Sequence, residues 1–375
     1  MRAGILTFHR ASNFGTALQA FATTKSFEKM GIDAELIDYR PQYIENTLQK
    51  GKIQNGKQLA SVIVNRIIYG DAQEEKVNCF LKFASGFSVS SEICKTIEDI
   101  EKVAQQYDVI VSGSDQLWNE NITGNDLAYF FPFKHKNKIT YASSFGTESI
   151  SQKRKNTISV YLKDFKAISV REVTGAALLN SLIKQGIDIP SIKVVPDPTF
   201  ILSKTEWVKY ENKNLVLPSN SYILTYYMIE TPLLRKLTKK IREDTGLPVL
   251  NIKPSKRQMV LHEGSNYPNI GPAEFLACYN HAAYVITNSF HGTAFAINFG
   301  IPFYTAPLPI SMAGEVNSRL KDILNMFGLE SRWIQNERKI KDIDVTQGIN
   351  IIKELEYQRK RGFDYIKNAI NIGES

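Results

Sequence analysis

Residues 284–305 read YVITNSFHGTAFAINFGIPFYT. Residues 284–287 are rich in β-branched and aromatic side chains, which predicts a short buried strand. Residues 294–299 have the pattern of the apolar face of a helix. Two hydroxyls, an amide, an imidazole and a glycine lie between these segments. The stretch therefore predicts a polar cluster where a strand ends and a helix begins, the edge at which open α/β sheets bind ligands.

The N-terminal part of the chain shows the same alternation of strand and helix patterns. Residues 3–8 are strand-like, residues 16–31 carry apolar side chains at helical spacing, and residues 34–38 are strand-like again. This order predicts a strand, a helix and a second strand parallel to the first. The unit resembles half of a nucleotide-binding fold, but it lacks the G-x-G-x-x-G pattern that binds dinucleotides.

Further strand patterns follow at regular intervals, and four of them end in small or polar residues. These four are residues 108–112 before GSDQLWN, 139–142 before SSFG, 167–170 before REVTG, and 194–195 before PDPTF. The repetition predicts one sheet whose carboxyl edge is the working face. A second alternating unit begins near residue 221, with strand patterns at 222–226, 248–252 and 284–287.

The length of 375 residues exceeds that of one ordinary domain and predicts two. We expect an N-terminal domain over residues 1–205 and a C-terminal domain over residues 206–344. Residues 345–375 contain a helical pattern that can pack back on the first domain, with Gly362 as its weak point.

The net charge of +8 fits an anionic small substrate or a phosphate-bearing lipid. The basic residues are scattered rather than gathered in a stripe with aromatic side chains, so no nucleic-acid partner is expected. Cys79, Cys94 and Cys278 form no CxxC pair, which indicates reduced thiols and no structural zinc. Residues 1–12 lack the pattern of a signal peptide, and no window reaches 18 apolar residues. The expected location is cytoplasmic, with peripheral contact at the inner face of the membrane as the alternative.

Six motifs in the chain, taken together and in this order, resemble those of the polysaccharide pyruvyl transferase family. They are SNFGTALQA (12–20), SGSDQLWN (112–119), SVRE (169–172), PDPTF (196–200), GPAEFL (271–276) and TNSFHGTAFAI (287–297). Members of this family are similar to GT-B glycosyltransferases, so the resemblance implies an α/β fold of two Rossmann-like domains facing a cleft. It also implies an enzyme that moves the pyruvyl group of phosphoenolpyruvate onto a sugar, forming a pyruvate ketal in capsule or exopolysaccharide biosynthesis.

The donor side of the predicted site is set by the charges of phosphoenolpyruvate, about three at neutral pH, which need cations and N–H donors. His291 is the predicted catalytic residue, as an acid or as an anion ligand, with a satisfied core histidine as the alternative. Ser-Phe precedes it where other members carry Arg-Leu, so another cation has to serve there. The predicted donor-binding residues are Arg171, Ser289, Gly292, Thr293 and Arg319.

Several of these donor-side residues have structural alternatives. Arg171 can form an intramolecular ion pair with Glu172 or another acid. Ser289 can serve only the turn between strand and helix, and Arg319 can be a solvated start of a helix. The chemistry of ketal formation requires no metal and no cofactor, so none is expected, and phosphoenolpyruvate is treated as a substrate.

The acceptor side of the predicted site follows the first strand and the strand at 108–112. Asp115 is the predicted base or sugar-hydroxyl partner, with a helix cap as the alternative. Trp118 offers a flat aromatic face for a sugar, and Asn13, Gly15 and Gln19 are predicted to bind acceptor hydroxyls. Without a ligand these last three would be turn residues. Asp197, between two prolines, is expected to be structural.

Two other functions remain open from the sequence. One is a GT-B glycosyltransferase that uses a nucleotide sugar, and the other is a non-catalytic sugar- or anion-binding protein. The expected acceptor of the transferase is a sugar, lipid-linked or nucleotide-linked, because both carriers bring phosphates that suit a basic protein.

Overall fold

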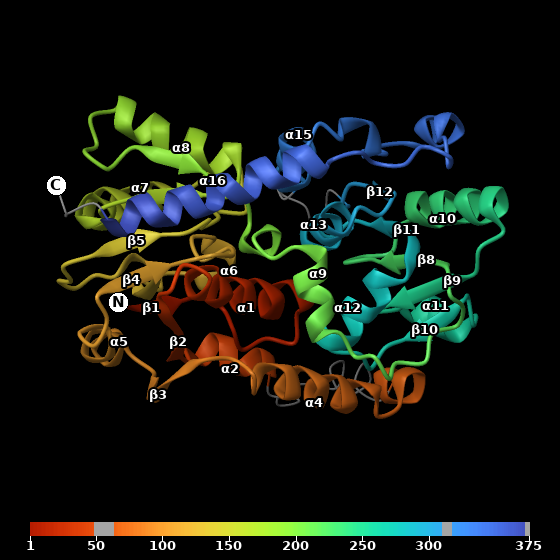
Figure 1. Ribbon diagram of the computed structural model, residues 1–375, viewed down its shortest axis with the longest axis horizontal. Helices are drawn as coiled ribbons and strands as arrows, with labels where there is room; N and C mark the ends of the chain where they lie inside the picture. The colour runs from red at the N-terminus through yellow and green to blue at the C-terminus, as the bar shows by residue number, and fades with distance from the viewer. Residues whose placement is uncertain (49–63, 310–316, 372–375) are drawn as a thin grey trace. The chain divides into compact units, whose positions relative to one another are not determined.

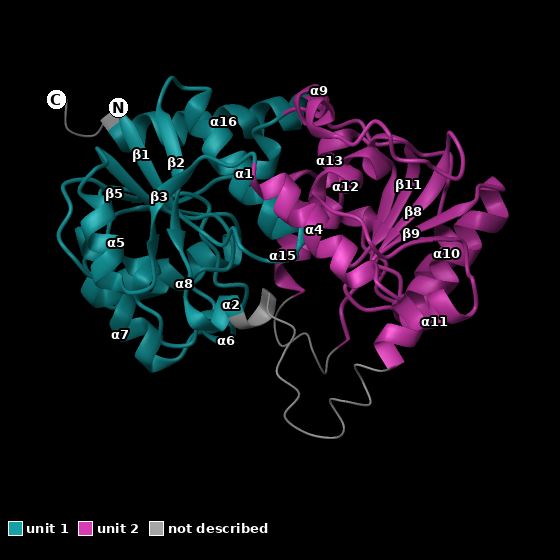
Figure 2. Ribbon diagram, turned by 90° about the horizontal axis from the view of Figure 1, so that it is seen from below, with its two compact units in different colours: residues 1–49, 86–202, 353–375 teal, residues 50–85, 203–352 magenta. Residues whose placement is uncertain are grey.

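The computed structural model describes residues 1–48, 64–309 and 317–371, and its elements alternate between strands and helices as predicted (Figure 1). The chain divides into two compact units (Figure 2). Unit 1 comprises residues 1–49, 86–202 and 353–375, and unit 2 comprises residues 50–85 and 203–352. The expected first domain of residues 1–205 therefore needs a correction, because residues 50–85 belong with unit 2. Residues 372–375 of the expected C-terminal segment lie outside the described residues.

The main sheet of unit 1 is parallel throughout, with the strand order β3-β2-β1-β4-β5. Its strands are β1 (Arg2–Leu6), β2 (Asp33–Tyr39), β3 (Val89–Cys94), β4 (Val109–Ser112) and β5 (Lys138–Thr140). The next two strands, β6 (Ile168–Val170) and β7 (Ile192–Val194), pair in a separate two-stranded sheet, so the single predicted sheet is wrong. Isolated parallel bridges, Ile139 to Ala167 and Ser143 to Val170, nevertheless connect this pair to the edge of the main sheet.

Helices cover both faces of this sheet, as the buried character of its strands requires. They are α1 (Phe14–Glu28), α2 (Gln42–Leu48), α5 (Ile97–Ala104), α6 (Glu120–Thr123), α7 (Gln152–Tyr161), α8 (Val173–Lys184) and α16 (Ile352–Asn371). Neighbouring strand residues point to opposite faces. Ile5 packs in a cluster with residues of α1 and α16. Leu6 packs in a second cluster with residues of α5, α7 and α8.

Unit 2 repeats this architecture with the parallel strand order β10-β9-β8-β11-β12. Its strands are β8 (Tyr222–Tyr226), β9 (Val249–Ile252), β10 (Ser265–Tyr267), β11 (Ala282–Thr287) and β12 (Phe303–Thr305). Its helices are α4 (Ala72–Ala84), α9 (Lys204–Trp207), α10 (Pro232–Thr245), α11 (Lys256–Val260), α12 (Pro272–Asn280), α13 (Phe290–Phe299) and α15 (Ser318–Met326). The sequence-predicted strand and helix of residues 284–299 are therefore confirmed as β11 and α13.

Helix α10 of unit 2 begins and ends at residues that are favoured at helix ends. Thr231 caps α10 by accepting the N–H of Leu234 at 3.2 Å, and Pro232 follows at the first helical position. Gly246 ends the same helix with φ 68°, a left-handed conformation that glycine adopts without strain.

Helices α12 and α13 of unit 2 pack against each other through Phe275 and Phe295, whose ring centroids lie 5.3 Å apart.

Gly362 of α16 lies at a point of very close packing inside unit 1. A Cβ atom at this position would meet Ile201 Cδ1 at 2.4 Å and the Tyr141 hydroxyl at 3.0 Å. One turn further, the Tyr365 hydroxyl donates a hydrogen bond to the carbonyl of Thr140 at 2.8 Å. The residue that weakens the helical pattern in the sequence is therefore the residue that lets α16 approach the sheet.

Replacing Gly362 with alanine tests this explanation. Alanine favours a helix by about 1 kcal/mol over glycine, but overpacking a core costs about 1–3 kcal/mol. We expect Gly362→Ala to lower the urea midpoint of unfolding, measured by circular dichroism. Gly348→Ala is the matched control, because a Cβ at Gly348 meets nothing within 4 Å. A Gly362→Ala protein as stable as the Gly348→Ala protein would contradict the close-packing explanation.

Candidate functional site

The carboxyl edge of the unit 1 strands carries a buried arginine surrounded by three carboxylates. Arg171 directly follows β6, and its side chain is 0% exposed. Its Nη1 atom lies 2.7 Å from Asp197 Oδ2, its Nη2 atom 3.5 Å from Asp115 Oδ1, and its Nε atom 3.6 Å from Glu172 Oε2. Burial disfavours the charged guanidinium, but the three carboxylates outweigh burial and raise the pKa of Arg171. The intramolecular ion pair considered for Arg171 is therefore present.

The three carboxylates around Arg171 are held by further hydrogen bonds. Asp197 Oδ1 accepts from the backbone N–H of Thr199 at 3.0 Å and from its hydroxyl at 2.8 Å. Glu172 Oε1 accepts from the hydroxyl of Ser144 at 2.6 Å. The bond from Ser144 connects the loop after β5 to the loop after β6, and the ion pair between Arg171 and Asp197 connects the loop after β6 to the loop after β7. Asp197, expected to be structural, thus belongs to this network.

Asp115 lies at the border of the same cluster, 5% exposed. Its Oδ2 atom accepts a hydrogen bond from the hydroxyl of Thr16 at 3.1 Å, which joins the loop after β4 to the first turn of α1. Its backbone is left-handed, with φ 81°, a conformation that aspartate tolerates better than most residues. The alternative role as a helix cap is wrong, because Asn119 caps α6 by accepting the N–H of Asn121.

The predicted acceptor-binding residues of α1 lie at its buried start. Asn13 is the N-cap and accepts the N–H of Thr16 at 3.3 Å. Gly15 is buried inside the first turn. Gln19 is 0% exposed and donates to the hydroxyl of Thr7 and the carbonyl of Phe8, both at 3.0 Å. Among the described residues, no group donates to its carbonyl oxygen Oε1.

Trp118 lies in the hydrophobic core rather than at the sheet edge. Its ring is fully buried, stacked on Phe130 at 5.7 Å and tilted against Phe145 at 5.2 Å. The predicted sugar-stacking role does not fit this placement, because no ring face is exposed. Asp115 and Trp118 are three residues apart in one motif, but only Asp115 joins the polar cluster.

A second polar cluster at this edge joins His9, a weaker candidate from the sequence, to Asp38 and Arg40, which the sequence reasoning missed. His9 Nε2 lies 3.2 Å from Asp38 Oδ1, and Arg40 donates to both Asp38 oxygens, at 2.9 and 2.6 Å. Burial raises the pKa of Asp38, but hydrogen bonds from His9 and Arg40 outweigh it and lower the pKa well below its usual value. The available signal was the presence of ionisable residues near the carboxyl ends of two neighbouring strands, β1 and β2.

In unit 2, the polar cluster of the opening stretch lies at the start of α13. Ser289 is the N-cap, and its hydroxyl accepts the N–H of Gly292 at 3.2 Å. Its carbonyl accepts the N–H of Thr293 at 2.9 Å. The two N–H groups predicted to bind the donor are therefore already bonded within the helix. His291 lies in the same turn and is 9% exposed.

Gly292 is required at this turn for packing. A Cβ atom there would meet Thr287 Oγ1 at 2.4 Å and Tyr226 Cδ1 at 2.9 Å. The hydroxyl of Thr287 also donates to the carbonyl of Tyr226 at 2.6 Å. The absence of a side chain at Gly292 therefore lets the first turn of α13 lie directly on the ends of β8 and β11.

Arg319 lies beside the same turn. This residue of α15 is 8% exposed, and its guanidinium carbon lies 5.9 Å from the ring centroid of Phe290. The Phe290 ring in turn contacts the His291 ring at 5.2 Å between centroids. Arg319 is therefore no solvated helix start, and it belongs to the His291 junction. Of the predicted donor-binding residues, Arg171 alone belongs to unit 1.

Asn288 adds a structural residue to this junction. It is 1% exposed, and its Oδ1 atom accepts the N–H of Met228 at 2.8 Å. Its Nδ2 atom donates to the carbonyl of Ile229 at 2.8 Å. One side chain thus fixes the loop that follows β8 against the loop that precedes α13.

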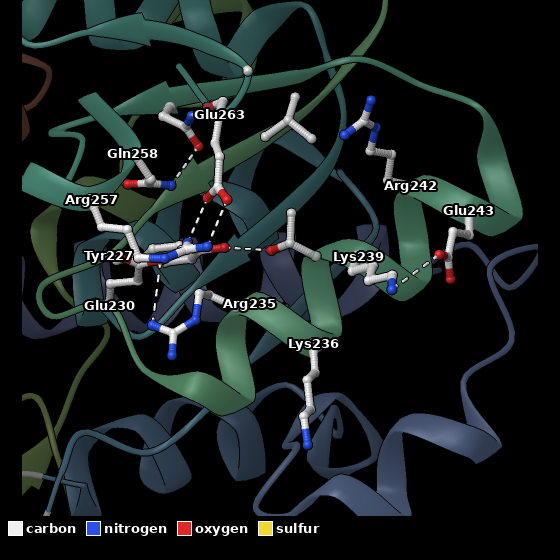
Figure 3. A pocket seen from close by; sticks show the side chains of 14 residues that line it. Tyr227, Glu230, Arg235, Lys236, Lys239, Arg242, Glu243, Arg257, Gln258 and Glu263 are labelled. Carbon is white, nitrogen blue, oxygen red and sulfur yellow. Dashed lines mark hydrogen bonds and ion pairs between the residues drawn. The ribbon is translucent and has the colours of Figure 1, made fainter. Parts of the chain in front are cut away.

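Unit 2 also contains a cavity of about 630 Å³ between α10, β9 and α11 (Figure 3). Its charged side chains are largely engaged with one another. Arg257 contacts Glu263 at 2.6 Å and Glu230 at 3.2 Å, and Lys239 contacts Glu243 at 3.7 Å. None of the predicted site residues lines this cavity.

The described part of the chain comprises residues 1–48, 64–309 and 317–371. In these ranges no three or more His, Cys, Asp and Glu side chains are grouped so that they could hold a metal ion. Over the same part of the chain, no helix combines the length and the apolar character needed to cross a membrane.

The fold is similar to that of solved UDP-GlcNAc 2-epimerases. The enzyme from Methanocaldococcus jannaschii has a TM-score of 0.57 at 13% identity, covering 98% of this chain and 99% of that chain. The enzyme from Neisseria meningitidis, bound to UDP-GlcNAc, has a TM-score of 0.51 at 12% identity, covering 99% and 98%. S. aureus MnaA with UDP has a TM-score of 0.52 at 11% identity, covering 99% and 96%. At these identities the likeness shows the fold alone, and it confirms the predicted GT-B-like α/β class.

No curated protein matches the chain. The sequence does match the model of a protein family. Residues 13–305 match the family model described as polysaccharide pyruvyl transferase. The match spans most of the chain and includes both the Asp115 cluster and the His291 junction. The chain therefore belongs to the polysaccharide pyruvyl transferase family.

Proposed function

We propose that the protein transfers the pyruvyl group of phosphoenolpyruvate to a sugar and forms a pyruvate ketal during the synthesis of a surface polysaccharide. The observation that carries the proposal is the His291 junction in a chain of this family. A buried imidazole lies in the first turn of α13, with Arg319 next to it across the Phe290 ring. The amino end of a helix and a guanidinium both favour an anionic ligand.

The reaction proposed for this junction begins with a proton. His291 or a group that it orients gives a proton to the methylene carbon of phosphoenolpyruvate, which becomes a methyl group. The adjacent carbon becomes cationic, and a sugar hydroxyl adds to it while a base takes the hydroxyl proton. The phosphate then leaves with the proton that the base took, and a second hydroxyl closes the ring on the same carbon while its proton restores the acid. Two new C–O bonds complete the ketal. Donor and sugar thus yield the ketal and free phosphate.

Asp115 is the proposed base or hydroxyl partner. Its Oδ2 atom faces the hydroxyl of Thr16, and its Oδ1 atom lies 3.5 Å from Arg171. A guanidinium beside one oxygen holds the carboxylate in a single orientation. The predicted role of Arg171 in donor binding stays a prediction, and its ion pairs support a positioning role toward Asp115 in addition. Asn13, Gly15 and Gln19 remain proposed acceptor-side residues.

The cofactor requirement, the acceptor and the cellular location are proposed from the chemistry of this reaction. Protonation, addition and loss of phosphate proceed through side chains, so the proposed mechanism uses neither a metal nor a cofactor. The acceptor is a sugar on a lipid or nucleotide carrier, and nucleic acid is not a proposed partner. The proposed location is the cytoplasm, with peripheral contact at the inner face of the membrane where the acceptor is lipid-linked.

The first test is thermal stabilisation by phosphoenolpyruvate. A ligand at 100 times its Kd stabilises a protein by about 2.7 kcal/mol, so the melting temperature should rise. We expect His291→Ala to abolish this rise. His281→Ala is the matched control, because His281 is an exposed histidine at the end of α12 in the same unit. A rise produced only by nucleotide sugars would instead favour a glycosyltransferase, and sugar binding by the wild type with no product formed would favour a binding protein.

The second test separates catalysis from donor binding at Asp115. Asparagine keeps the shape of the side chain and tolerates the left-handed backbone, but it cannot take a proton. We expect Asp115→Asn to lower kcat by about 10²–10⁴-fold while the stabilisation by phosphoenolpyruvate persists. Asp33→Asn, at the amino end of β2, is the control. Activity of Asp115→Asn within threefold of the control would exclude Asp115 as the base.

A further inference from the structure

Lys253 has a backbone conformation that lysine rarely adopts. It directly follows β9 at the carboxyl edge of unit 2, and its φ is 56°. A left-handed backbone brings Cβ close to the following carbonyl, so a residue other than glycine persists there only when its surroundings hold it. Such positions gather at ligand sites. The side chain of Lys253 is therefore placed at this edge by the fold rather than by local preference.

The ammonium group of Lys253 is held against the neighbouring strand. Its Nζ atom lies 3.4 Å from the carbonyl oxygen of Met228, in the loop after β8. Lys253 is an exposed residue, yet the surrounding protein removes enough water from its ammonium group to lower its pKa. The group thus lies beside the loop that Asn288 connects to the start of α13.

Lys76, in α4, is a second positively charged side chain near Lys253. Two hydrogen bonds hold the start of α4 near the carboxyl ends of β9 and β10. The Tyr69 hydroxyl donates to the carbonyl of Pro254 at 3.1 Å, and Asn269 donates to Glu75 at 2.6 Å. Burial and the neighbouring charge of Lys253 lower the pKa of Lys76 to about 8. Two ammonium groups that repel each other at a ligand-binding edge are stabilised when an anion binds between them.

The strand order places these lysines near the His291 junction. The order β9-β8-β11 separates the carboxyl ends of β9 and β11 by two strand spacings, about 10 Å. Lys253 follows β9, and His291 follows β11. Side chains that extend toward each other across this distance can reach the two ends of one small anion.

We propose that Lys253 and Lys76 form a phosphate-binding subsite beside His291, and that the phosphate is that of the anionic donor. The inference rests on the proposed function. The donor carries about three negative charges, and Arg319, Lys76 and Lys253 together supply three positive charges at this edge of unit 2. The two residues before His291 are Ser289 and Phe290, and neither carries a charge.

The experiment measures binding of inorganic phosphate, phosphoenolpyruvate and pyruvate by calorimetry. We expect Lys253→Gln and Lys76→Gln each to raise the Kd of phosphoenolpyruvate at least tenfold. The double variant should lose phosphate binding, while pyruvate, which has no phosphate, should bind as in the wild type. Lys253→Arg should restore affinity for phosphoenolpyruvate. Lys256→Gln is the matched control, because Lys256 is an exposed lysine three residues further on, and circular dichroism verifies that each variant is folded.

The outcomes distinguish failure of the proposed lysine subsite from failure of the proposed function. If the double variant binds phosphate and phosphoenolpyruvate within twofold of the Lys256→Gln control, while His291→Ala binds neither, the subsite is wrong and the proposed function stands. If the wild type binds no phosphoenolpyruvate but binds UDP or inorganic pyrophosphate through both lysines, the phosphate subsite stands and its assignment to the donor is wrong. Failure of the wild type to bind any of these anions would overturn both.

Discussion

Parallel pairing of the strands is the constraint on which both units depend. In a parallel sheet every strand presents its carboxyl end at the same edge, so loops far apart in the sequence become neighbours. In unit 1 this brings together the loops after β4, β5, β6 and β7, which meet around Arg171. In unit 2 it brings together the loops after β8, β9 and β11. Each cluster of polar residues exists because of this edge.

The Arg171 cluster is a costly arrangement that the surrounding hydrogen bonds make possible. Charges removed from water lose solvation, and their attraction offsets this loss only with good geometry and further partners. Here Asp197 is supported by Thr199, Glu172 by Ser144, and Asp115 by Thr16. Such a network is a weak contribution to stability, but it fixes the direction of each carboxylate. Asp115 is therefore held between the hydroxyl of Thr16 and the guanidinium of Arg171.

The His291 junction is organised differently, through the close approach of backbones. Gly292 lets α13 rest on β8, while Ser289 satisfies the first N–H groups of the helix. Asn288 then holds the loop after β8. The junction therefore owes its backbone arrangement to its glycine, serine and asparagine.

The sequence alone determined the fold class and the location of the key junction. Alternating strand and helix patterns predicted two α/β units, and the polar interruption of residues 284–305 identified the turn around His291. These inferences succeeded because hydrophobic periodicity and turn residues are local properties. The burial of Trp118, the assignment of residues 50–85 to unit 2, and the position of Lys253 beside Met228 were decided only by the tertiary structure. They depend on strand order and on which helix covers which face, and these are set by packing between segments that are distant in the sequence.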